Sequence, residues 1–379
     1  MYDRLFQPPD SSFFLFGPRG TGKTSLLKNQ FKNSVYFDLL DSSWFDQFLA
    51  RPQSLEYEIG KHANKWVILD EVQKVPQLLN EVHRLIESKK IKFILTGSSA
   101  RSLRKKGVNL LAGRALWTQL HPLTYPELKK DFSLEHALKY GMLPQTYNIE
   151  KPEDYLNSYM RTYIREEVQQ ESLVRNLAGF SRFLEAASFS QAQILNISAV
   201  ASECHVNRSV VTDYFNILED LLISFRLPVF NKRAKRELLL SEKFFYFDNG
   251  VYRKIRPKGP LDSNEELDGA SLETLLLQEL RALNDYLKLE YQFYFWRTKK
   301  NQEVDFILYG PKGLLAIEVK RSHRLKEENY SALQLFKKDY PMAKCFYVYG
   351  GTKVQNYKDI SIVPYEDFFK NLKPLLINT

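Results

Sequence analysis

The sequence predicts an α/β protein with more than one domain, and three observations lead to this expectation. A glycine-rich stretch, Gly17–Thr24, lies between a short apolar run and a helical pattern. A second apolar run, Trp66–Leu69, ends in the acids Asp70 and Glu71. Far downstream, two strand-like runs joined by Gly310–Gly313 carry an acid and a Glu-x-Lys pattern. The chain has 379 residues, which is more than one ordinary domain contains.

The glycine-rich stretch fits the phosphate-binding pattern G-x-x-x-x-G-K-[ST] without a mismatch. Phe13–Phe16 before it is predicted to be a buried strand, and Ser25–Lys28 after it continues as a helix. Backbone N–H groups of such a loop bind phosphate oxygens, helped by the positive end of the helix dipole. We expect Lys23 to reach the β- and γ-phosphates of ATP and the Thr24 hydroxyl to ligate Mg²⁺. The expected ATP-binding residues are Gly17, Pro18, Arg19, Gly20, Thr21, Gly22, Lys23, Thr24 and Ser25.

Two acids after the second apolar run have the form of a Walker B element, in which carboxylates follow a buried strand. We expect Asp70 to hold Mg²⁺ through its water shell and Glu71 to polarise the attacking water. The alternative is a helix cap followed by a first-turn acid. The position downstream of a phosphate-binding loop favours the catalytic interpretation.

A third predicted strand, Lys92–Leu95, runs into a polar tip that contains Thr96 and Ser98. Either hydroxyl is a candidate to contact the γ-phosphate or the attacking water, and a turn that caps the next helix is the alternative. Arg114 lies on a predicted loop after this strand. It is a candidate arginine finger that acts on a neighbouring subunit of a homo-oligomer, or an exposed residue without a catalytic role.

Residues 197–222 have the outline of a helix-turn-helix, with Ser198 as a candidate cap and a turn at His205–Asn207. Predicted strands at Ile223–Phe230 and Phe244–Phe247 would complete a winged helix. Ten Lys or Arg and three Asp or Glu lie between residues 226 and 258, a candidate phosphate-backbone surface. The expected groove contacts are Asn207, Arg208, Ser209 and Thr212, and the expected phosphate contacts are Lys232, Arg233, Lys235 and Arg236. The alternative is a winged helix that serves as a lid or a packing unit.

The C-terminal third carries a second candidate site, on the two strands joined at Gly310–Gly313. Period-2 alternation allows Asp305, Glu318 and Lys320 to converge on one face. Two carboxylates that hold Mg²⁺ or Mn²⁺ and a Lys beside them are typical of metal-dependent nucleases. A helix expected at Gly269–Leu287 could add the carboxylate of Glu273 or that of Glu279. The alternative is a set of cross-strand ion pairs.

Composition limits the classes of protein that the chain can represent. Apolar residues make up 44% of the sequence, which supports buried cores, and no run approaches the roughly 20 apolar residues that cross a bilayer. The N-terminus lacks the pattern of a signal peptide, so we expect a cytoplasmic protein without a membrane partner. Its two cysteines, Cys204 and Cys345, are far apart and lack metal-ligand spacing, which fits a reducing compartment.

In their order along the chain, these segments resemble a family of prokaryotic AAA-type ATPases that carry a C-terminal domain similar to PD-(D/E)XK nucleases. The resemblance rests on Gly17–Thr24, Leu69–Gln73, Leu95–Ser98, Leu111–Arg114, His121–Leu123, Phe244–Val251, Trp296–Thr298, Glu303–Phe306 and Ile317–Lys320. It implies an N-terminal P-loop NTPase, a parallel sheet with flanking helices, then a central helical and winged-helix region and a C-terminal restriction-endonuclease-like α/β domain. The implied boundaries are 1–128 for the AAA-type ATPase core, 129–180 for a helical lid or connector, 181–256 for the winged helix and 257–379 for the nuclease-like domain.

The resemblance implies ATP binding through Lys23 and Thr24, Mg²⁺ at Asp70 and hydrolysis by Glu71. One departure from the family pattern concerns the acid of the helix expected at Gly269–Leu287. In the family this acid usually follows a Phe, whereas Glu273 follows Leu272. The expected function is Mg²⁺-dependent ATP binding and hydrolysis coupled to DNA or partner binding. Two alternatives stay open, an ATP-gated metal-dependent nuclease and a regulatory nucleotide switch with a protein partner, the latter suggested by 22 Tyr and 26 Phe.

Overall fold

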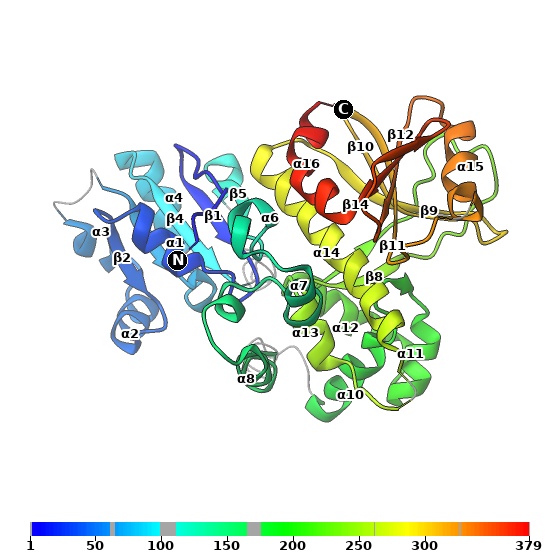
Figure 1. Cartoon of the computed structure of the whole chain (residues 1–379). Coiled ribbons are helices and arrows are strands. Elements are labelled where there is room, and N and C mark those ends of the chain that lie inside the picture. Colours follow the sequence, from blue (N-terminus) through cyan, green and yellow to red (C-terminus); the bar gives the residue numbers. More distant parts are fainter. Residues whose placement is uncertain are drawn as a thin grey trace. The chain divides into compact units, whose positions relative to one another are not determined.

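The computed structural model describes residues 2–60, 65–98, 111–164, 176–260, 262–325 and 327–378 (Figure 1). The chain forms two compact units. The first comprises Met1–Pro122 and Ile217–Ile223, and the second comprises Leu123–Asn216 and Ser224–Thr379. In the described part of the chain, no helix has both the length and the apolar character needed to cross a membrane.

The first unit is built around a parallel sheet of five strands in the order β2-β3-β4-β1-β5 (Figure 1). The strands are β1 (Phe13–Phe16), β2 (Val35–Asp38), β3 (Val67–Asp70), β4 (Phe93–Gly97) and β5 (Leu116–Gln119). The helices between them are α1 (Lys23–Gln30), α2 (Ser42–Ala50), α3 (Ser54–Ile59) and α4 (Leu78–Lys89). This arrangement confirms the expected parallel sheet with flanking helices.

Strands β1, β3 and β4 are buried on both faces, and they are apolar until β3 ends in Asp70 and β4 reaches Thr96. Alternate residues of these strands share one core with α2, α3 and α4, among them Phe14, Phe16, Leu69 and Leu95. The residues between them, such as Phe13, Leu15, Ile68 and Ile94, are also buried. The strand order places β4 between β1 and β3, so the carboxyl ends of these three strands meet at one edge of the sheet.

The second unit begins with short helices, which are followed by longer helices and a small antiparallel sheet. The elements of its first half are α6 (Tyr125–Leu128), α7 (Leu134–Tyr140), α8 (Pro152–Ser158), α10 (Leu177–Ser188), β6 (Gln193–Ile194), α11 (Ile197–Cys204), α12 (Arg208–Asp220, whose residues from Ile217 onward are grouped with the first unit), β7 (Ser224–Leu227), β8 (Lys243–Tyr246) and α13 (Asn249–Ile255). Strand β8 is the central strand of the antiparallel sheet β6-β8-β7. The two predicted helices around His205–Asn207 and the two predicted strands are present, although β7 is shorter than expected and β8 begins and ends one residue earlier.

The expected cap at Ser198 is wrong. Helix α11 begins one residue before Ser198, and Asn196 is its cap because the Asn196 side chain accepts a hydrogen bond from Ala199 N over 3.1 Å. Asn and Ser are both good caps, so composition alone did not separate them.

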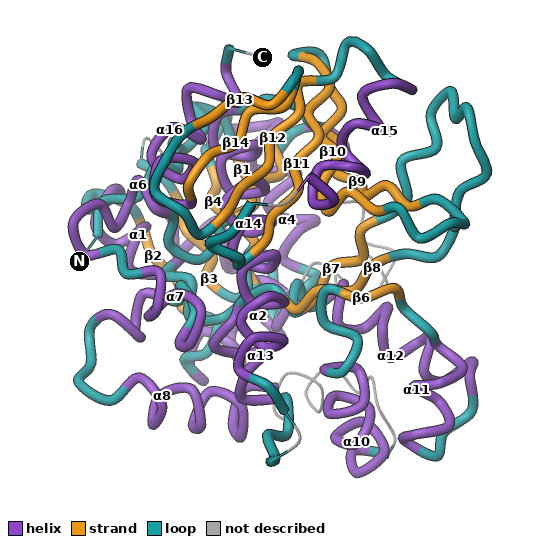
Figure 2. Tube along the Cα trace, turned by 45° about the vertical axis from the view of Figure 1, so that its right-hand side comes forward, coloured by secondary structure: helices purple, strands orange, loops and turns teal. Residues whose placement is uncertain are grey.

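The second half of this unit is a mixed sheet of six strands in the order β13-β14-β12-β11-β10-β9 (Figure 2). Its elements are α14 (Asn264–Leu287), β9 (Gln292–Arg297), β10 (Glu303–Gly310), β11 (Gly313–Lys320), α15 (Ser331–Asp339), β12 (Lys344–Tyr349), β13 (Gln355–Tyr357), β14 (Ile360–Pro364) and α16 (Tyr365–Ile377). Strands β9, β10 and β11 are antiparallel neighbours, and β12 and β14 continue the sheet in parallel with β11. The predicted hairpin at Gly310–Gly313 is confirmed.

The expected start of the late helix at Gly269 is wrong. Helix α14 begins at Asn264, because the Ser263 hydroxyl accepts a hydrogen bond from Glu266 N over 3.1 Å and caps it. Acids in the first turn, Glu265 and Glu266, complement the helix dipole at that end. Gly269 lies inside the helix, at a modest cost in helix propensity.

Candidate functional site

The phosphate-binding loop joins the end of β1 to the start of α1. Gly22 is the cap of α1 with φ 92°, a left-handed conformation that glycine adopts without strain. Gly17 lies so close to the carbonyl oxygen of Leu120 that a Cβ atom at this position would collide with it. The Lys23 ammonium donates to the carbonyl oxygens of Gly17 over 2.7 Å and Pro18 over 3.3 Å. Lys23 is therefore held over the loop whose N–H groups would bind phosphate.

Asp70 connects this loop to the neighbouring strands. Its Oδ2 accepts a hydrogen bond from the Thr24 hydroxyl over 2.8 Å, and its Oδ1 accepts one from the Thr96 hydroxyl. The hydroxyl of Tyr36 on β2 also donates to Oδ2. Burial raises the pKa of Tyr36, and the adjacent Asp70 raises it further. A hydroxyl and a carboxylate side by side are ligands that Mg²⁺ prefers, so Thr24 and Asp70 fit the expected ion.

Glu71 lies directly after β3 in the left-handed conformation, with φ 60°. Its N–H donates to the Thr96 hydroxyl over 3.2 Å, so one buried threonine fixes both Asp70 and the backbone of Glu71. The side-chain amide of Gln73 donates to the Glu71 carboxylate and to the Ser98 hydroxyl, the latter over 3.3 Å. The structure thus brings Thr24, Asp70, Glu71, Thr96 and Ser98 together at one sheet edge.

Three residues of this site were not predicted from the sequence. Arg4 donates to the carbonyl oxygens of Thr21 and His121, each over 2.6 Å, and so ties the N-terminal segment to the loop. Tyr36 and Gln73 contact the two acids through their side chains. Gln73 follows Glu71 by two residues and lies in the quoted motif, so its spacing could have indicated the contact. Arg4 carries no such local signal.

Arg114 forms an ion pair with Glu87 on α4 of the same chain. Its side chain keeps 35% of its exposure. This contact places Arg114 at the surface of the first unit, and its action on a neighbouring subunit stays a prediction.

The residues predicted to read a DNA groove lie at the start of α12. Asn207, Arg208 and Ser209 are exposed. Thr212 is half-buried, and its hydroxyl donates to the Arg208 carbonyl oxygen over 3.0 Å. Exposed side chains at a helix N-terminus are the ones that a recognition helix directs to base edges.

The four residues predicted to contact phosphates lie on the connection between β7 and β8, residues 228–242. Arg233 and Lys235 are exposed. Lys232 donates to Gln292 over 3.2 Å and lies 4.4 Å from the ring centre of Tyr309. Arg236 forms a two-point ion pair with the buried Asp339. Two of the four cations therefore already have partners within the unit.

This connection packs along the edge of the six-stranded sheet. Val229 and Leu238 form isolated bridges with Phe295 and Thr298, and Phe230 N donates to the Phe295 carbonyl oxygen over 2.7 Å. An exposed sheet edge is a site of unwanted pairing, and a covering segment removes it. The connection 228–242, which would be the wing of the predicted winged helix, therefore covers the edge strand β9 in this unit.

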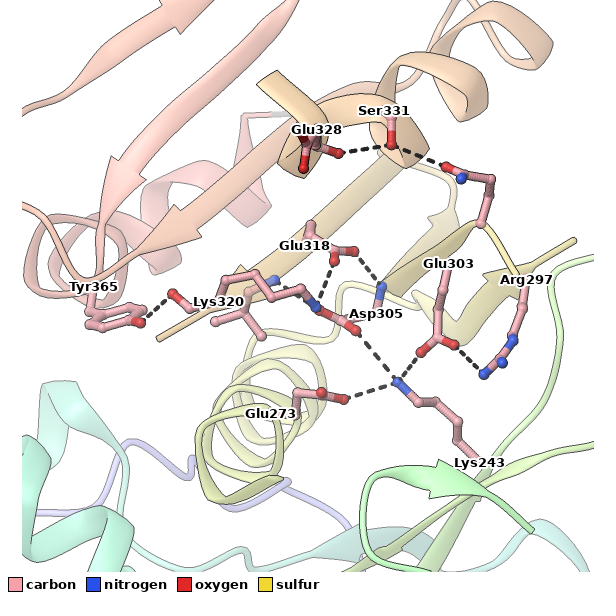
Figure 3. A network of polar contacts seen from close by, with 12 residues as sticks. Lys243, Glu273, Arg297, Glu303, Asp305, Glu318, Lys320, Glu328, Ser331 and Tyr365 are labelled. Carbon is pink, nitrogen blue, oxygen red and sulfur yellow. Dashed lines mark hydrogen bonds and ion pairs between the residues drawn. The ribbon is translucent and has the colours of Figure 1, made fainter. Parts of the chain in front are cut away.

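The second candidate site forms where β10 and β11 run side by side (Figure 3). Lys320 Nζ lies 2.7 Å from Glu318 Oε1 and 3.4 Å from Asp305 Oδ2. Asp305 Oδ2 also accepts a hydrogen bond from Val319 N over 2.9 Å, and Asp305 N donates to Glu318 Oε2 over 3.3 Å. The structure thus brings together the acid and the Glu-x-Lys pair identified in the sequence.

A lysine that sequence reasoning missed lies beside this pair. Lys243 Nζ lies 2.6 Å from Glu303 Oε1, 3.0 Å from Glu273 Oε2 and 3.5 Å from Asp305 Oδ1 (Figure 3). Arg297 binds the other oxygen of Glu303 over 2.8 Å. Lys243 lies 30 residues before Glu273 and 62 residues before Asp305 and carries no motif, so only the fold reveals these contacts.

Burial and mutual repulsion control the protonation of these carboxyl groups. Burial, followed by the charge of Asp305, raises the pKa of Glu318 to about 8 and that of Glu273 to about 7. Burial alone would raise the pKa of Asp305 as well, but the ammonium groups of Lys320 and Lys243 hold it below its ordinary value. Asp305 therefore stays charged at neutral pH.

Glu279, the other carboxyl group considered for this site, lies elsewhere. It is fully buried, and its Oε1 accepts a hydrogen bond from Tyr125 N over 2.6 Å. Its Oε2 has no hydrogen-bond partner among the residues that the structure describes. Burial raises the pKa of Glu279 well above its ordinary value. Glu273 is thus the helix acid that joins the cluster.

The cluster around Asp305 does not fit a divalent metal ion in this arrangement. Within the described residues, no group of three or more His, Cys, Asp or Glu side chains is placed to hold a metal. The ammonium of Lys243 lies where Glu273, Glu303 and Asp305 converge, so its charge occupies their common side.

Three family models match successive parts of the chain. Residues 10–129 match an AAA domain, residues 131–262 match a domain of unknown function (DUF8612), and residues 268–368 match a domain of unknown function (DUF4143). Each match covers less than half of the 379 residues. The first match contains Gly17–Thr24, Asp70, Glu71 and Thr96.

Two curated relatives share much of the chain's length. The chain is 24% identical over 366 residues to the uncharacterized protein MJ1544 of Methanocaldococcus jannaschii, covering 87% of this chain and 80% of the relative. It is 22% identical over 353 residues to an uncharacterized protein of Haemophilus influenzae, covering 83% and 84%. Both similarities extend well beyond the AAA domain.

Two solved structures show only weak similarity. The ORC1 protein of Aeropyrum pernix, solved in complex with DNA, is 13% identical with a TM-score of 0.26, covering 66% of this chain and 86% of that one. Protein VC1899 from Vibrio cholerae is 11% identical with a TM-score of 0.25, covering 90% and 97%. Scores this low bear on neither the fold nor the ligand of this chain. The match to the AAA domain and the parallel sheet with its phosphate-binding loop together support an AAA-type ATPase unit at the N-terminus.

Proposed function

We propose that this chain is a Mg²⁺-dependent ATPase whose nucleotide state is coupled to the binding of DNA or a protein partner. The observation that carries the proposal is the contact between Thr24 Oγ1 and Asp70 Oδ2 over 2.8 Å. It joins the phosphate-binding loop to the acids of β3, so that the binding and hydrolysing groups share one edge of the sheet.

Each residue has a distinct task in the proposed hydrolysis. Lys23 exchanges the carbonyl oxygens of Gly17 and Pro18 for oxygens of the β- and γ-phosphates. Glu71 accepts the proton of the attacking water. Thr96 holds Asp70 and the Glu71 backbone in position. Held by Thr24 and Asp70, Mg²⁺ would neutralise negative charge on the phosphates.

Coupling to DNA is supported by the exposed residues Asn207, Arg208 and Ser209 at the start of α12 and by Arg233 and Lys235 on the connection after β7. A net charge of +9 adds a general attraction for nucleic acid. The regulatory switch with a protein partner remains the alternative. It would retain nucleotide tightly and turn over slowly whether or not DNA is present.

Phosphate release from ATP, measured with and without duplex DNA, tests the proposal. We expect Mg²⁺-dependent turnover that DNA raises in the wild type and does not raise in Arg233→Ala/Lys235→Ala. Turnover that DNA leaves unchanged would refute the coupling to DNA and favour the switch. A rate per chain that rises with protein concentration in the wild type and not in Arg114→Ala would support an arginine finger shared between subunits.

A further inference from the structure

The buried ammonium of Lys243 is surrounded by carboxylates from two other elements. It contacts Glu273 on α14 and both Glu303 and Asp305 on β10, at distances of 2.6 to 3.5 Å (Figure 3). The Lys243 side chain keeps 2% of its exposure. Lysine is almost never buried so completely without paired anions, so these contacts account for its position.

Lys243 is held in place by its own strand. Its backbone pairs with Ile194 of β6 and Leu227 of β7, because β8 is the central strand of that sheet. The ring centre of Phe295 lies 5.7 Å from its Nζ, within the range of a cation–π contact. The side chain therefore cannot leave the cluster without losing its contacts with the buried Asp305 and with Glu273 and Glu303.

The oxygens that would ligate a metal are already used. Asp305 Oδ1 faces Lys243, and Asp305 Oδ2 accepts from Val319 N and faces Lys320. Glu318 Oε1 lies 2.7 Å from Lys320 Nζ, and Glu318 Oε2 accepts from Asp305 N. A divalent ion placed among these oxygens would also lie within a few ångströms of the Lys243 ammonium and be repelled by it.

We infer that the Lys243 ammonium occupies the position among Glu273, Glu303 and Asp305 that a divalent metal ion would need. This network of ion pairs, called the lock below, therefore excludes such an ion. The lock joins β8 to α14 and β10 within the second unit. The nuclease-like residues Asp305, Glu318 and Lys320 then hold the unit together and do not cleave phosphodiesters. This inference is independent of the ATPase proposal, since it involves no residue of the nucleotide site.

Binding of Mn²⁺ to the nucleotide-free full-length chain, followed by electron paramagnetic resonance, tests the lock. We expect the wild type and Asp305→Asn to bind the same amount of Mn²⁺. Lys243→Met should bind one additional ion per chain, and Lys243→Met/Asp305→Asn should lose that ion again. Lys299→Met is the matched control, since Lys299 forms an exposed ion pair with Glu237, and it should behave like the wild type.

Two results would overturn the inference. The first is a Mn²⁺ site in the wild type that Asp305→Asn removes, or DNA cleavage by the wild type that Asp305→Asn abolishes. The second is the lack of any additional Mn²⁺ in folded Lys243→Met. If that variant does not fold, the comparison of the wild type with Asp305→Asn still decides the question. Mn²⁺ should also raise the melting temperature of Lys243→Met and leave that of the wild type unchanged.

Discussion

The Thr96 hydroxyl donates to Asp70 Oδ1 and accepts a hydrogen bond from Glu71 N, so the tip of β4 organises both acids of β3. The sequence suggested that Thr96 contacts the γ-phosphate or the attacking water. The structure shows it buried beneath the acids, with its hydroxyl engaged by them. Any effect of Thr96 on hydrolysis is therefore expected to pass through Asp70 and Glu71.

Replacing Thr96 with Val removes both hydrogen bonds while keeping the side-chain volume. We expect a stability loss of about 1–3 kcal/mol from the unsatisfied partners. We also expect kcat for ATP hydrolysis to fall more than KM rises, because the acids lose their orientation. Denaturant unfolding and steady-state kinetics measure the two effects. Thr96→Ser keeps the hydroxyl and should restore kcat; if it does not, the hydroxyl is not the group that matters.

Replacing Lys23 with Ala should weaken ATP binding. A charged hydrogen bond contributes about 1.5–3 kcal/mol, which corresponds to roughly a 10- to 150-fold loss of affinity. Titration with a fluorescent ATP analogue measures the dissociation constant. Lys32→Ala, an exposed lysine just after α1, is the control and should bind like the wild type. Equal affinities for Lys23→Ala and Lys32→Ala would contradict a role of Lys23 in nucleotide binding.

The buried carboxyl group of Glu279 should make the stability of the second unit depend on pH. Its folded pKa is raised by burial, whereas the unfolded value is about 4.3. The folded state therefore binds this proton more tightly than the unfolded state does. The contribution of the protonated Glu279 to the stability of the unit is fully present below the unfolded pKa and is lost as the pH rises toward the folded pKa. Glu279→Gln, a neutral isostere, should escape this loss.

Thermal unfolding at pH 5 and pH 8 measures this difference. We expect Glu279→Gln to gain stability over the wild type as the pH rises, by about 1.4 kcal/mol for each unit of raised pKa. Glu290→Gln, at an exposed position after α14, is the control and should follow the wild type. A constant difference between Glu279→Gln and the wild type at both pH values would show that Glu279 is ionised in the folded protein.

The basic residues after β7 should divide into two classes. Arg233→Ala/Lys235→Ala should lower the salt dependence of DNA binding, by about 2 in the slope of log K against log salt if both residues contact phosphates. Arg236→Ala should mainly lower stability, because it leaves the buried Asp339 unpaired. Fluorescence anisotropy of labelled duplex at several salt concentrations, with thermal unfolding alongside, separates the two. An unchanged slope in the double variant would exclude these two residues from a phosphate-binding surface.

Local patterns predicted the strands around the phosphate-binding loop because these segments are short and ordered along the chain. The apolar runs before Gly17 and Asp70 are strands, and the strand order brings their carboxyl ends to one edge. The alternation of β10 and β11 likewise placed Asp305 and Glu318 together. In each case the signal was a period or a motif within one short segment.

Long-range contacts could not be predicted in this way. Lys243 was assigned to a basic block, whereas its ammonium is enclosed by Glu273, Glu303 and Asp305. Arg236 was grouped with phosphate-binding residues, yet it pairs with Asp339, 103 residues later. A single charged residue shows its charge in the sequence, but its partner depends on how distant elements pack.

Phosphate release from ATP by Glu71→Gln, measured with the binding of a fluorescent ATP analogue, tests the proposed hydrolysis most directly. The glutamine keeps the shape of Glu71 and removes its ability to accept the proton of water. We expect ATP affinity to remain close to that of the wild type and phosphate release to fall by roughly 10²–10⁴-fold. Hydrolysis at the wild-type rate in a folded, ATP-binding Glu71→Gln would contradict the assignment of Glu71 as the general base.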